Sequence, residues 1–402
     1  MECPDLQAIY SFLEEIRTSL TDYRATRSNL ARNQALKQAV KLTRALENPK
    51  DAIFKLFLSP TQAMAVKIAH DLGLFSLLAN SETAISCKDL ADRSVKSDDR
   101  VTERIMRVIA AMDFAGGDGP GHYHATLLSK EMAGKKSGIV DTLFLDLAPA
   151  ILQAPAFLRD THYQNPEDQS AGPIQYTYHT QMNSFEWLAS HKAAHARFHA
   201  YVEGVREGQS DWVDWFSVQA RILDGYASIP SDPLIVDVAA GSGRDMLAFK
   251  RKFPDVAGRI IIQDLPVVFQ DVHCQDLGLE KIEHDVFAPQ PVVGARVYYL
   301  RFILHEFSDD NCRRILENIT HVMTKGYSKI LIEEFLLPDA HATLFHSMVD
   351  MILMVFGPGA VRTQTRWVAL LESVGLTVNL VAHPDGDGPS IIEAELVNVE
   401  SE

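Results

Sequence analysis

The stretch LIVDVAAGSGRDMLAF (residues 234–249) carries the strongest structural signal in the chain. A short apolar run passes through a turn of small residues into a segment with the pattern of a helix. Gly241 and Gly243 have no Cβ, so the backbone can turn sharply there and approach a bound ligand closely. The stretch therefore predicts a strand, a ligand-binding turn and a helix, or else the same tight turn with no ligand.

Three further apolar runs follow this stretch in the last 170 residues, and helix-like segments separate them. They are RIIIQDLP, RVYYLRFIL and KILIEEFLL. Alternation of this kind is typical of a doubly wound parallel sheet, and near-continuous apolar strands fit burial on both faces. The sequence therefore predicts an α/β fold for this part of the chain.

Two carboxylates come at the ends of the strands that follow the glycine turn. Asp264 lies about twenty residues beyond the glycines, where a carboxylate can accept hydrogen bonds from both hydroxyls of a ribose. Asp285, one strand further on, is placed to meet an adenine amino group. Either residue alone could be a cap or a turn residue, but together they predict a nucleoside site. The turn lacks the Lys-Ser/Thr pair of a P-loop, which argues against ATP or GTP.

A histidine lies where another apolar run ends, in YYLRFILHEFSDDN (residues 298–311). His305 could be a solvated loop residue, a structural histidine or a catalytic base. An unperturbed imidazole titrates near neutrality, which suits a base that takes a proton from a phenol or an enol. Its neighbour Glu306 is expected to cap the following helix or to support the loop.

The N-terminal part has the pattern of a mainly helical, winged-helix-like module. Residues 6–48 show helical spacing, and a further helix is expected to begin with Ser59 as its N-cap and Pro60 in the first position. Two short helices over 87–114 precede a glycine-rich segment that suggests a small hairpin. Residues 160–176 are expected to be loop, and helical signals resume over 181–226.

Composition and charge limit the partners. The chain has 402 residues, of which 47% are apolar and 23% charged, and this length predicts two domains, here 1–150 and 151–402, with a helical substrate-pocket segment over 176–226. The net charge of −15 argues against a nucleic-acid partner and against an anionic membrane surface, because both need clustered Lys and Arg.

The cysteines and the N-terminus bear on the compartment. Cys3, Cys87, Cys274 and Cys312 lie far apart with no zinc-type spacing, so we expect free thiols and no metal site. We find no signal-peptide pattern and no uninterrupted apolar run near the ~18 residues that a membrane span needs. These observations predict a soluble protein in the reducing cytoplasm.

The order of these motifs resembles a known family. VDVAAGSG, QDLPVV, HDVF, LRFILHEFSDDNCRRIL, KILIEEFLLPD and GAVRTQTRWVALLESVGL follow one another as in class I S-adenosylmethionine-dependent O-methyltransferases. The branch that the chain resembles is the caffeate/flavonoid type of plants and of fungal secondary metabolism. The resemblance implies a Rossmann-like methyltransferase domain preceded by a helical, winged-helix-like dimerisation domain, and hence a homodimer.

The resemblance also implies a cofactor, S-adenosyl-L-methionine, and the residues that would hold it. These are Asp237, Gly241, Gly243, Asp264, Leu265, Asp285, Val286, Phe287 and Arg301. The glycines would form the cofactor turn with Asp237 supporting it from the strand. The residues at 264–265 would hold the ribose, and those at 285–287 would border the adenine.

Three residues are implied in catalysis. His305 stands where the family has its general base, Glu334 where it has a carboxylate that orients the base, and Arg301 where it has a basic residue near the cofactor. Glu333 competes with Glu334, because a register error of one residue would exchange them. Val361 stands in GAVRT where many members have a second Glu.

The main departure from the family at the turn is mild. Ala239 and Ala240 replace the first glycines of its GGG loop.

Three functions follow from this reading. The first is an O-methyltransferase that acts on a phenolic or enolic hydroxyl of a small metabolite, with His305 as base. The second keeps the cofactor but catalyses dehydration or pericyclic rearrangement, with Arg301 and His305 polarising the substrate, and Val361 favours it. The third is a regulatory binding module on the same scaffold. Substrate-lining positions are expected over 176–187 and 348–356, where ordinary core packing is the alternative.

Overall fold

In this computed structural model the described residues are 5–95, 97–134, 137–227, 229–269, 278–384 and 388–397. The chain forms two compact units. Unit 1 comprises Met1–Thr26, Gln34–Phe157 and Ile174–Gly208, and unit 2 comprises Arg27–Asn33, Leu158–Pro173 and Gln209–Glu402. The two units are described separately below.

Unit 2 is built on a sheet that has seven strands within the described residues, in the order β6-β5-β4-β7-β8-β10-β9. The strands are β4 (Pro233–Val238), β5 (Arg259–Asp264), β6 (Glu280–Glu283), β7 (Val297–Arg301), β8 (Lys329–Glu334), β9 (Leu376–Ala382) and β10 (Ser390–Leu396). The strands from β6 to β8 are parallel, and β10 and β9 add to the edge in antiparallel pairing. The predicted doubly wound sheet is confirmed, and β10 and β9 extend it.

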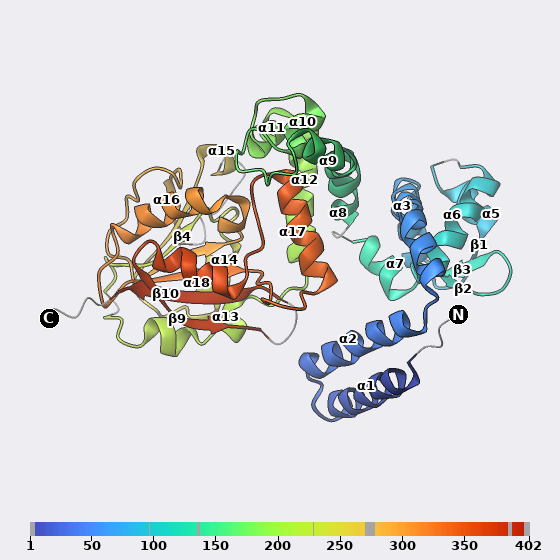
Figure 1. The fold of residues 1–402 in the computed structure, drawn as a ribbon, viewed down its shortest axis with the longest axis horizontal. Coiled ribbons are helices and arrows are strands. Elements are labelled where there is room, and N and C mark those ends of the chain that lie inside the picture. The colour runs from blue at the N-terminus through green and yellow to red at the C-terminus, as the bar shows by residue number, and fades with distance from the viewer. Residues whose placement is uncertain are drawn as a thin grey trace. The chain divides into compact units, whose positions relative to one another are not determined.

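Helices of unit 2 cover both faces of this sheet (Figure 1). They are α13 (Trp212–Trp215), α14 (Arg244–Lys252), α15 (Pro266–Phe269), α16 (Asp309–Thr320) and α18 (Gln364–Glu372), with a π-helical turn η2 (Gln219–Leu223) and a 3₁₀ turn η4 (Leu304–Glu306). Unit 2 also contains α17 (Leu344–Phe356).

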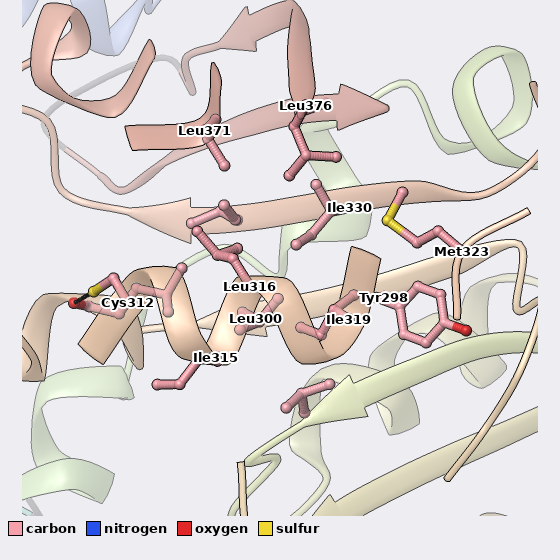
Figure 2. Close-up of a cluster of buried hydrophobic side chains, with 14 of the residues drawn as sticks. Tyr298, Leu300, Cys312, Ile315, Leu316, Ile319, Met323, Ile330, Leu371 and Leu376 are labelled. Carbon is pink, nitrogen blue, oxygen red and sulfur yellow. Dashed lines mark hydrogen bonds between the residues drawn. The ribbon is translucent and has the colours of Figure 1, made fainter. Parts of the chain in front are cut away.

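Successive residues of each central strand enter different cores. In β4, Val236 packs with α16 and α18, whereas Ile235 packs with α13 and α14. Figure 2 shows the first of these cores, where Leu316 of α16 lies near Ile330 of β8. Since both faces are buried, the central strands need mostly apolar residues, and the runs LIV of β4, III of β5 and ILI of β8 supply them.

Unit 1 is mainly helical. Its elements are α1 (Leu6–Thr26), α2 (Asn29–Leu46), α3 (Pro49–Asp71), α4 (Leu74–Ala79), α5 (Cys87–Arg93), α6 (Asp99–Ala111), α7 (Leu127–Met132), α8 (Ser137–Asp141), η1 (Thr142–Leu147), α9 (Ala148–Asp160), α10 (Pro173–Tyr178), α11 (Ser184–Ser190) and α12 (Lys192–Arg206). Among the described residues it has one small sheet of β1 (Ile85–Ser86), β3 (His122–His124) and β2 (Gly116–Gly117). The predicted hairpin of the winged-helix-like module is present as the β2–β3 pair.

The start predicted for the third helix is wrong. α3 begins at Pro49 with Asn48 as its cap, and Pro60 lies inside the helix. Proline has no N–H to donate to the carbonyl four residues earlier, which is that of Leu56. The Ser59 hydroxyl donates to this carbonyl at 2.8 Å, so the helix passes the proline with the acceptor satisfied.

One helix lies where a loop was expected. α10 begins at Pro173, inside the stretch 160–176 that was expected to be loop.

The helical run Ser137–Asp160 is, by length and composition alone, long and apolar enough to cross a membrane. Within this run the Asp146 carboxylate is buried and forms an ion pair with Arg197 of α12, which is typical of a packed helix in a folded domain.

The cysteines were expected to be free thiols. Cys87 and Cys312 are free thiols, whereas Cys3 and Cys274 lie outside the described residues.

One group of side chains in the described residues has the geometry to hold a metal ion. It consists of His70, Asp71 and Asp141, and the ammonium of Lys67 contacts the carboxylates of both aspartates. The domain boundary at residue 150 stays a prediction.

The core in Figure 2 generates a test of the fold. Leu316 is fully buried between α16 and the sheet, so Leu316→Ala should remove its contacts and leave a cavity. We expect the free energy of unfolding, measured by urea denaturation, to fall by about 2–5 kcal/mol. Glu317 is the exposed neighbour of Leu316 on the same helix, and Glu317→Ala should change the free energy of unfolding by less than about 0.5 kcal/mol. Equal losses in the two variants would contradict this packing.

Candidate active site

The glycine turn joins β4 to α14 at the carboxyl edge of the sheet. Three of its residues have positive φ angles: Ala239 at 59°, Gly241 at 56° and Gly243 at 71°. A Cβ at Gly241 would meet no atom within 4 Å, so the turn is open on that side, whereas a Cβ at Gly243 would lie 3.2 Å from Cδ1 of Ile262. Gly243 therefore permits close helix–strand packing, and Gly241 leaves room for a ligand. At Ala239 the left-handed conformation costs about 1–2 kcal/mol that glycine would avoid.

Asp264 closes the turn from the end of β5. Its Oδ2 accepts the N–H of Gly241 at 2.8 Å, and its Oδ1 accepts the N–H of Leu265 at 2.8 Å. Burial raises the pKa of the Asp264 carboxyl, and these two hydrogen bonds offset part of the rise. Each carboxylate oxygen retains acceptor capacity, because an oxygen of this kind accepts more than one hydrogen bond.

The segment after β6 lies next to Asp264. The N–H of His284 donates to the backbone carbonyl of Asp264 at 2.9 Å, which places Asp285 beside the same edge. Asp285 uses one carboxylate oxygen to accept the N–H of Phe287 at 3.0 Å, and the Phe287 ring packs edge-on against Phe307. The predicted nucleoside residues at 264–265 and 285–287 therefore lie on adjacent strand ends.

Asp237 lies inside the sheet, one strand position before β4 ends. It is buried, and it pairs with Ile262 of β5 on one side and Tyr299 of β7 on the other. Its place is below the turn, where the sequence analysis expected support for it.

His305 lies in η4, just beyond the end of β7. Its Nδ1 lies 2.7 Å from Oε2 of Glu334, and its backbone N–H donates to Oε1 of the same carboxylate at 3.2 Å. Its Nε2 lies 3.2 Å from Oε1 of Glu306. Both ring nitrogens therefore face a carboxylate.

These carboxylates control the proton affinity of His305. Burial by itself would lower the pKa of the imidazole, but the negative charge of Glu334 and the hydrogen bonds of both carboxylates outweigh burial and raise the pKa to about 10. The ring is therefore protonated at neutral pH in this structure.

The surroundings of His305 hold it in place. Its ring stacks on Phe302 with centroids 5.4 Å apart, and Phe302 itself has a φ of 53°. The His305 carbonyl accepts the N–H of Ala360 at 2.9 Å. A Cβ at Gly359 would lie 2.2 Å from that carbonyl, so only glycine allows this close approach.

The structure separates the two competing acids of β8. Glu334 faces His305, as described above. Glu333 faces the other side of the strand, where it accepts a hydrogen bond from the hydroxyl of Tyr299 and lies 3.4 Å from Nε of Arg301. Neighbouring residues of a strand point to opposite faces, which explains the division.

Arg301 is held in a buried ionic network. Its guanidinium donates to Asp245 Oδ1 at 2.7 Å and to Gln209 Oε1 at 3.1 Å, in addition to the contact with Glu333. Burial would lower the pKa of Arg301, but the two carboxylates outweigh burial and raise it. The network links the first turn of α14, next to the glycine turn, to β8.

Sequence reasoning missed the contacts of two residues around His305. Glu306 was expected to cap the following helix or to support the loop; Ser308 caps α16, and Glu306 contacts the imidazole. The buried guanidinium of Arg362 donates to the carbonyls of Leu304 and Phe307, which lie on either side of the His305–Glu306 pair. No spacing rule reveals these contacts. The one signal in the sequence is an arginine directly after Val361, at the end of an otherwise apolar segment.

Val361 is buried, and a carboxylate from another element approaches its backbone. The N–H of Val361 donates to Oδ1 of Asp350 in α17 at 2.7 Å. Sequence analysis did not single out Asp350, because the two residues lie on different elements.

Comparisons with known proteins agree with this geometry. Residues 168–377 match the model of the O-methyltransferase domain, and residues 54–135 match that of the O-methyltransferase dimerisation domain. The O-methyltransferase penC of Penicillium thymicola is 34% identical over 367 residues, which cover 90% of this chain and 91% of that protein. The O-methyltransferase asqD of Emericella nidulans is 34% identical over 344 residues, which cover 85% and 88%.

Solved structures extend the comparison to the fold. LepI in complex with SAM superposes with a TM-score of 0.87 at 25% identity, covering 96% of this chain and 100% of that chain. OxaC in complex with SAH and oxaline superposes with a TM-score of 0.83 at 24% identity, covering 97% and 99%. The resemblance predicted from the motifs is confirmed, and the chain belongs to the family of S-adenosylmethionine-dependent O-methyltransferases.

Proposed function

We propose that this protein transfers a methyl group from S-adenosyl-L-methionine to a phenolic or enolic hydroxyl of a small secondary metabolite, with His305 as the general base. Membership of the family supports the reaction type. The observation that carries the assignment of the base is the contact of 2.7 Å between Nδ1 of His305, just beyond the end of β7, and Glu334 at the end of β8. β7 is the direct neighbour of β4, which bears the glycine turn.

The residues around the glycine turn fit the cofactor. The open side of Gly241 leaves room for it, and the oxygens of Asp264 can accept the two ribose hydroxyls. Leu265, Asp285, Val286 and Phe287 would border the adenosine, with Asp237 supporting the turn from β4. When bound, S-adenosyl-L-methionine supplies an electrophilic methyl group on a sulfonium centre.

His305 would accept the proton of the acceptor hydroxyl at Nε2. Glu334 lies 2.7 Å from Nδ1 and accepts the backbone N–H of His305, so its charge would stabilise the protonated form of the ring. General-base catalysis of this kind is worth about 10²- to 10⁴-fold in rate. Arg301 would act at a distance, because its network with Asp245 and Glu333 sets the position of α14 relative to β8.

A homodimer belongs to this proposal. The dimerisation-domain match begins at residue 54, and large apolar side chains in that part of α3 are exposed: Phe54 at 68%, Leu56 at 71% and Phe57 at 77%. Exposed apolar patches of this kind mark interaction surfaces. The acidic charge of the chain supports a small molecule rather than a nucleic acid or a membrane as the other partner, and a cytoplasmic location is part of the same proposal.

A second candidate is an enzyme that binds the same cofactor but catalyses dehydration or pericyclic rearrangement. Two features favour it: Val361 stands where many members of the family have an acid, and Glu334 and Glu306 raise the pKa of His305 and so favour its imidazolium form. A fixed imidazolium can stabilise negative charge on a substrate without accepting a proton. A solved structure described as a pericyclic reaction enzyme also shares the fold, with a TM-score of 0.87. The carboxylates of Asp245 and Glu333 neutralise Arg301, so His305 would have to act without it.

Methyl-labelled S-adenosyl-L-methionine separates these two functions. We expect the protein, incubated with the small-molecule extract of its source organism, to form a product that is heavier by one labelled methyl group. His305→Ala should lower kcat/KM by about 10²- to 10⁴-fold, because the base is lost. Glu334→Gln should lower it less, because the ring keeps its place but loses the charge behind it.

Glu317→Gln removes an exposed carboxylate from α16 and should leave the rate unchanged. A metabolite that changes structure without gaining label, while the cofactor is needed but not consumed, would instead establish the second candidate.

The open side of Gly241 can be tested without a methyl-acceptor substrate. Gly241→Ala places a Cβ in the space proposed for the cofactor. The dissociation constant of S-adenosyl-L-methionine, measured by calorimetry, should therefore rise about tenfold, or ~1.4 kcal/mol. Gly326→Ala is the matched control, because Gly326 has a φ of 71°, has no atom within 4 Å of an added Cβ, and lies before β8 at the other end of the sheet. Similar losses in both variants would place the cofactor elsewhere.

The exposed residues of α3 generate a test of the dimer. Phe57→Asp should shift the sedimentation coefficient toward that of a monomer at micromolar concentration, because a charge would be buried at the interface. Val293→Asp changes an exposed residue of unit 2 outside the dimerisation match and should sediment as the wild type does. A wild-type protein that sediments as a monomer would overturn the proposal.

A further inference from the structure

The proposed base is blocked at the atom it would use. Glu334 occupies Nδ1 of His305, so Nε2 is the nitrogen left for an acceptor hydroxyl. The carboxylate of Glu306 already lies 3.2 Å from Nε2. In addition the ring is an imidazolium, since both carboxylates raise its pKa to about 10, and an imidazolium accepts no proton. Two things must therefore happen before His305 can act: Glu306 must leave Nε2, and the proton there must leave too.

The two carboxylates differ in their freedom to move. Glu334 belongs to β8, its side chain is 1% exposed, and it contacts His305 twice. The side chain of Glu306 is 17% exposed, and it stands at the end of a single 3₁₀ turn. Glu306 can therefore rotate away from the ring, whereas Glu334 has no comparable freedom.

The other charged groups near His305 are committed elsewhere. Arg362 is bound to the carbonyls of Leu304 and Phe307 and to the carboxylate of Asp309 in α16. Asp350 of α17 accepts the N–H of Val361. Phe302, which stacks on the ring, is apolar. Among the described residues, Glu334 and Glu306 are thus the charged side chains with a recorded contact to the imidazole.

We propose that Glu306 is a positioning residue that gates His305: an entering acceptor hydroxyl takes the place of Glu306 at Nε2, and Glu306 carries away the proton of that nitrogen. The inference rests on the proposed function. In the first step the Nε2–H bond breaks, an O–H bond forms on Glu306, and the imidazole becomes neutral. In the second step Nε2 would take the proton of the acceptor hydroxyl as its oxygen bonds to the methyl group, the bond from that methyl group to the sulfonium sulfur would break, and the thioether would leave. Glu306 would then lose its proton to solvent, so one proton is released for each methyl group transferred.

The second negative charge on His305 comes from Glu306, the residue next to it in the chain, and Val361 contributes no carboxylate. Position 361 directly follows the loop in which Gly359 and Ala360 pack against the His305 backbone, whereas the Glu306 side chain is 17% exposed.

The first measurement is the pKa of His305 from the hydrogen-exchange rate of its Cε1–H, followed by mass spectrometry across a pH series on the full-length protein. This readout needs no acceptor. We expect a value of about 10 in the wild type and a fall of about one to three units in Glu306→Gln, the usual effect of losing one close opposite charge. Glu306→Ala should give the same fall, and Glu317→Gln on α16 should give none.

The second measurement is the pH profile of kcat/KM for the acceptor that gains label in the extract assay. Removing the charge of Glu306 should move the acid limb of the profile to lower pH, and kcat should fall because the proton has lost its exit. A merely structural role for Glu306 would change the rate without moving the limb.

Each remaining outcome overturns the gate. A His305 pKa that is equal in the wild type and in Glu306→Gln would do so while leaving the methyltransferase intact. A lowered pKa with an unmoved acid limb would show that the contact does not control the base. Absence of labelled product from the wild type would remove the proposed function itself, and the pKa measurement distinguishes that case because it does not depend on turnover.

Discussion

Burial of a parallel sheet on both faces is the constraint on which the rest of unit 2 depends. The side chains of β4 alternate between two cores, so neither face is left for a polar site. The polar chemistry is therefore confined to the strand ends. Because β4, β5, β7 and β8 run in the same direction, their carboxyl ends meet at one edge. The glycine turn, Asp264, His305 and Glu334 all lie at that edge for this reason.

The charges that lie beneath this edge are paired. Arg301 is bound between Asp245 and Glu333, and the imidazolium of His305 is bound between Glu334 and Glu306. An unpaired charge in such surroundings would be costly, which explains why each cation has two acidic partners. The two ionic groups meet in adjacent residues of β8, so the position of the glycine turn and the orientation of the proposed base are joined through one strand.

Elements whose cause is local were predictable from the sequence, and contacts between distant elements were not. Strands β4, β5, β7 and β8 and the glycine turn follow from apolar runs and small residues, so they were predicted, whereas β9 and β10 were not. Pro60 was taken for a helix start because nothing in its neighbourhood shows that the Ser59 hydroxyl would satisfy the carbonyl of Leu56. Glu306 was expected to cap the following helix or to support the loop, because a carboxylate near a helix start can do either, and only the direction of its side chain shows that it contacts the imidazole.

The sequence by itself determined the doubly wound sheet, the glycine turn after β4 and the presence of a histidine just beyond the end of β7, because each depends on residues that are close along the chain. The tertiary structure alone decided that Glu334 rather than Glu333 faces the histidine, that Arg301 is neutralised, and that Glu306 stands on Nε2. Those outcomes depend on which face of a strand a side chain occupies and on what the neighbouring elements bring to it. Spacing along the chain does not contain that information, since a shift of one residue reverses it.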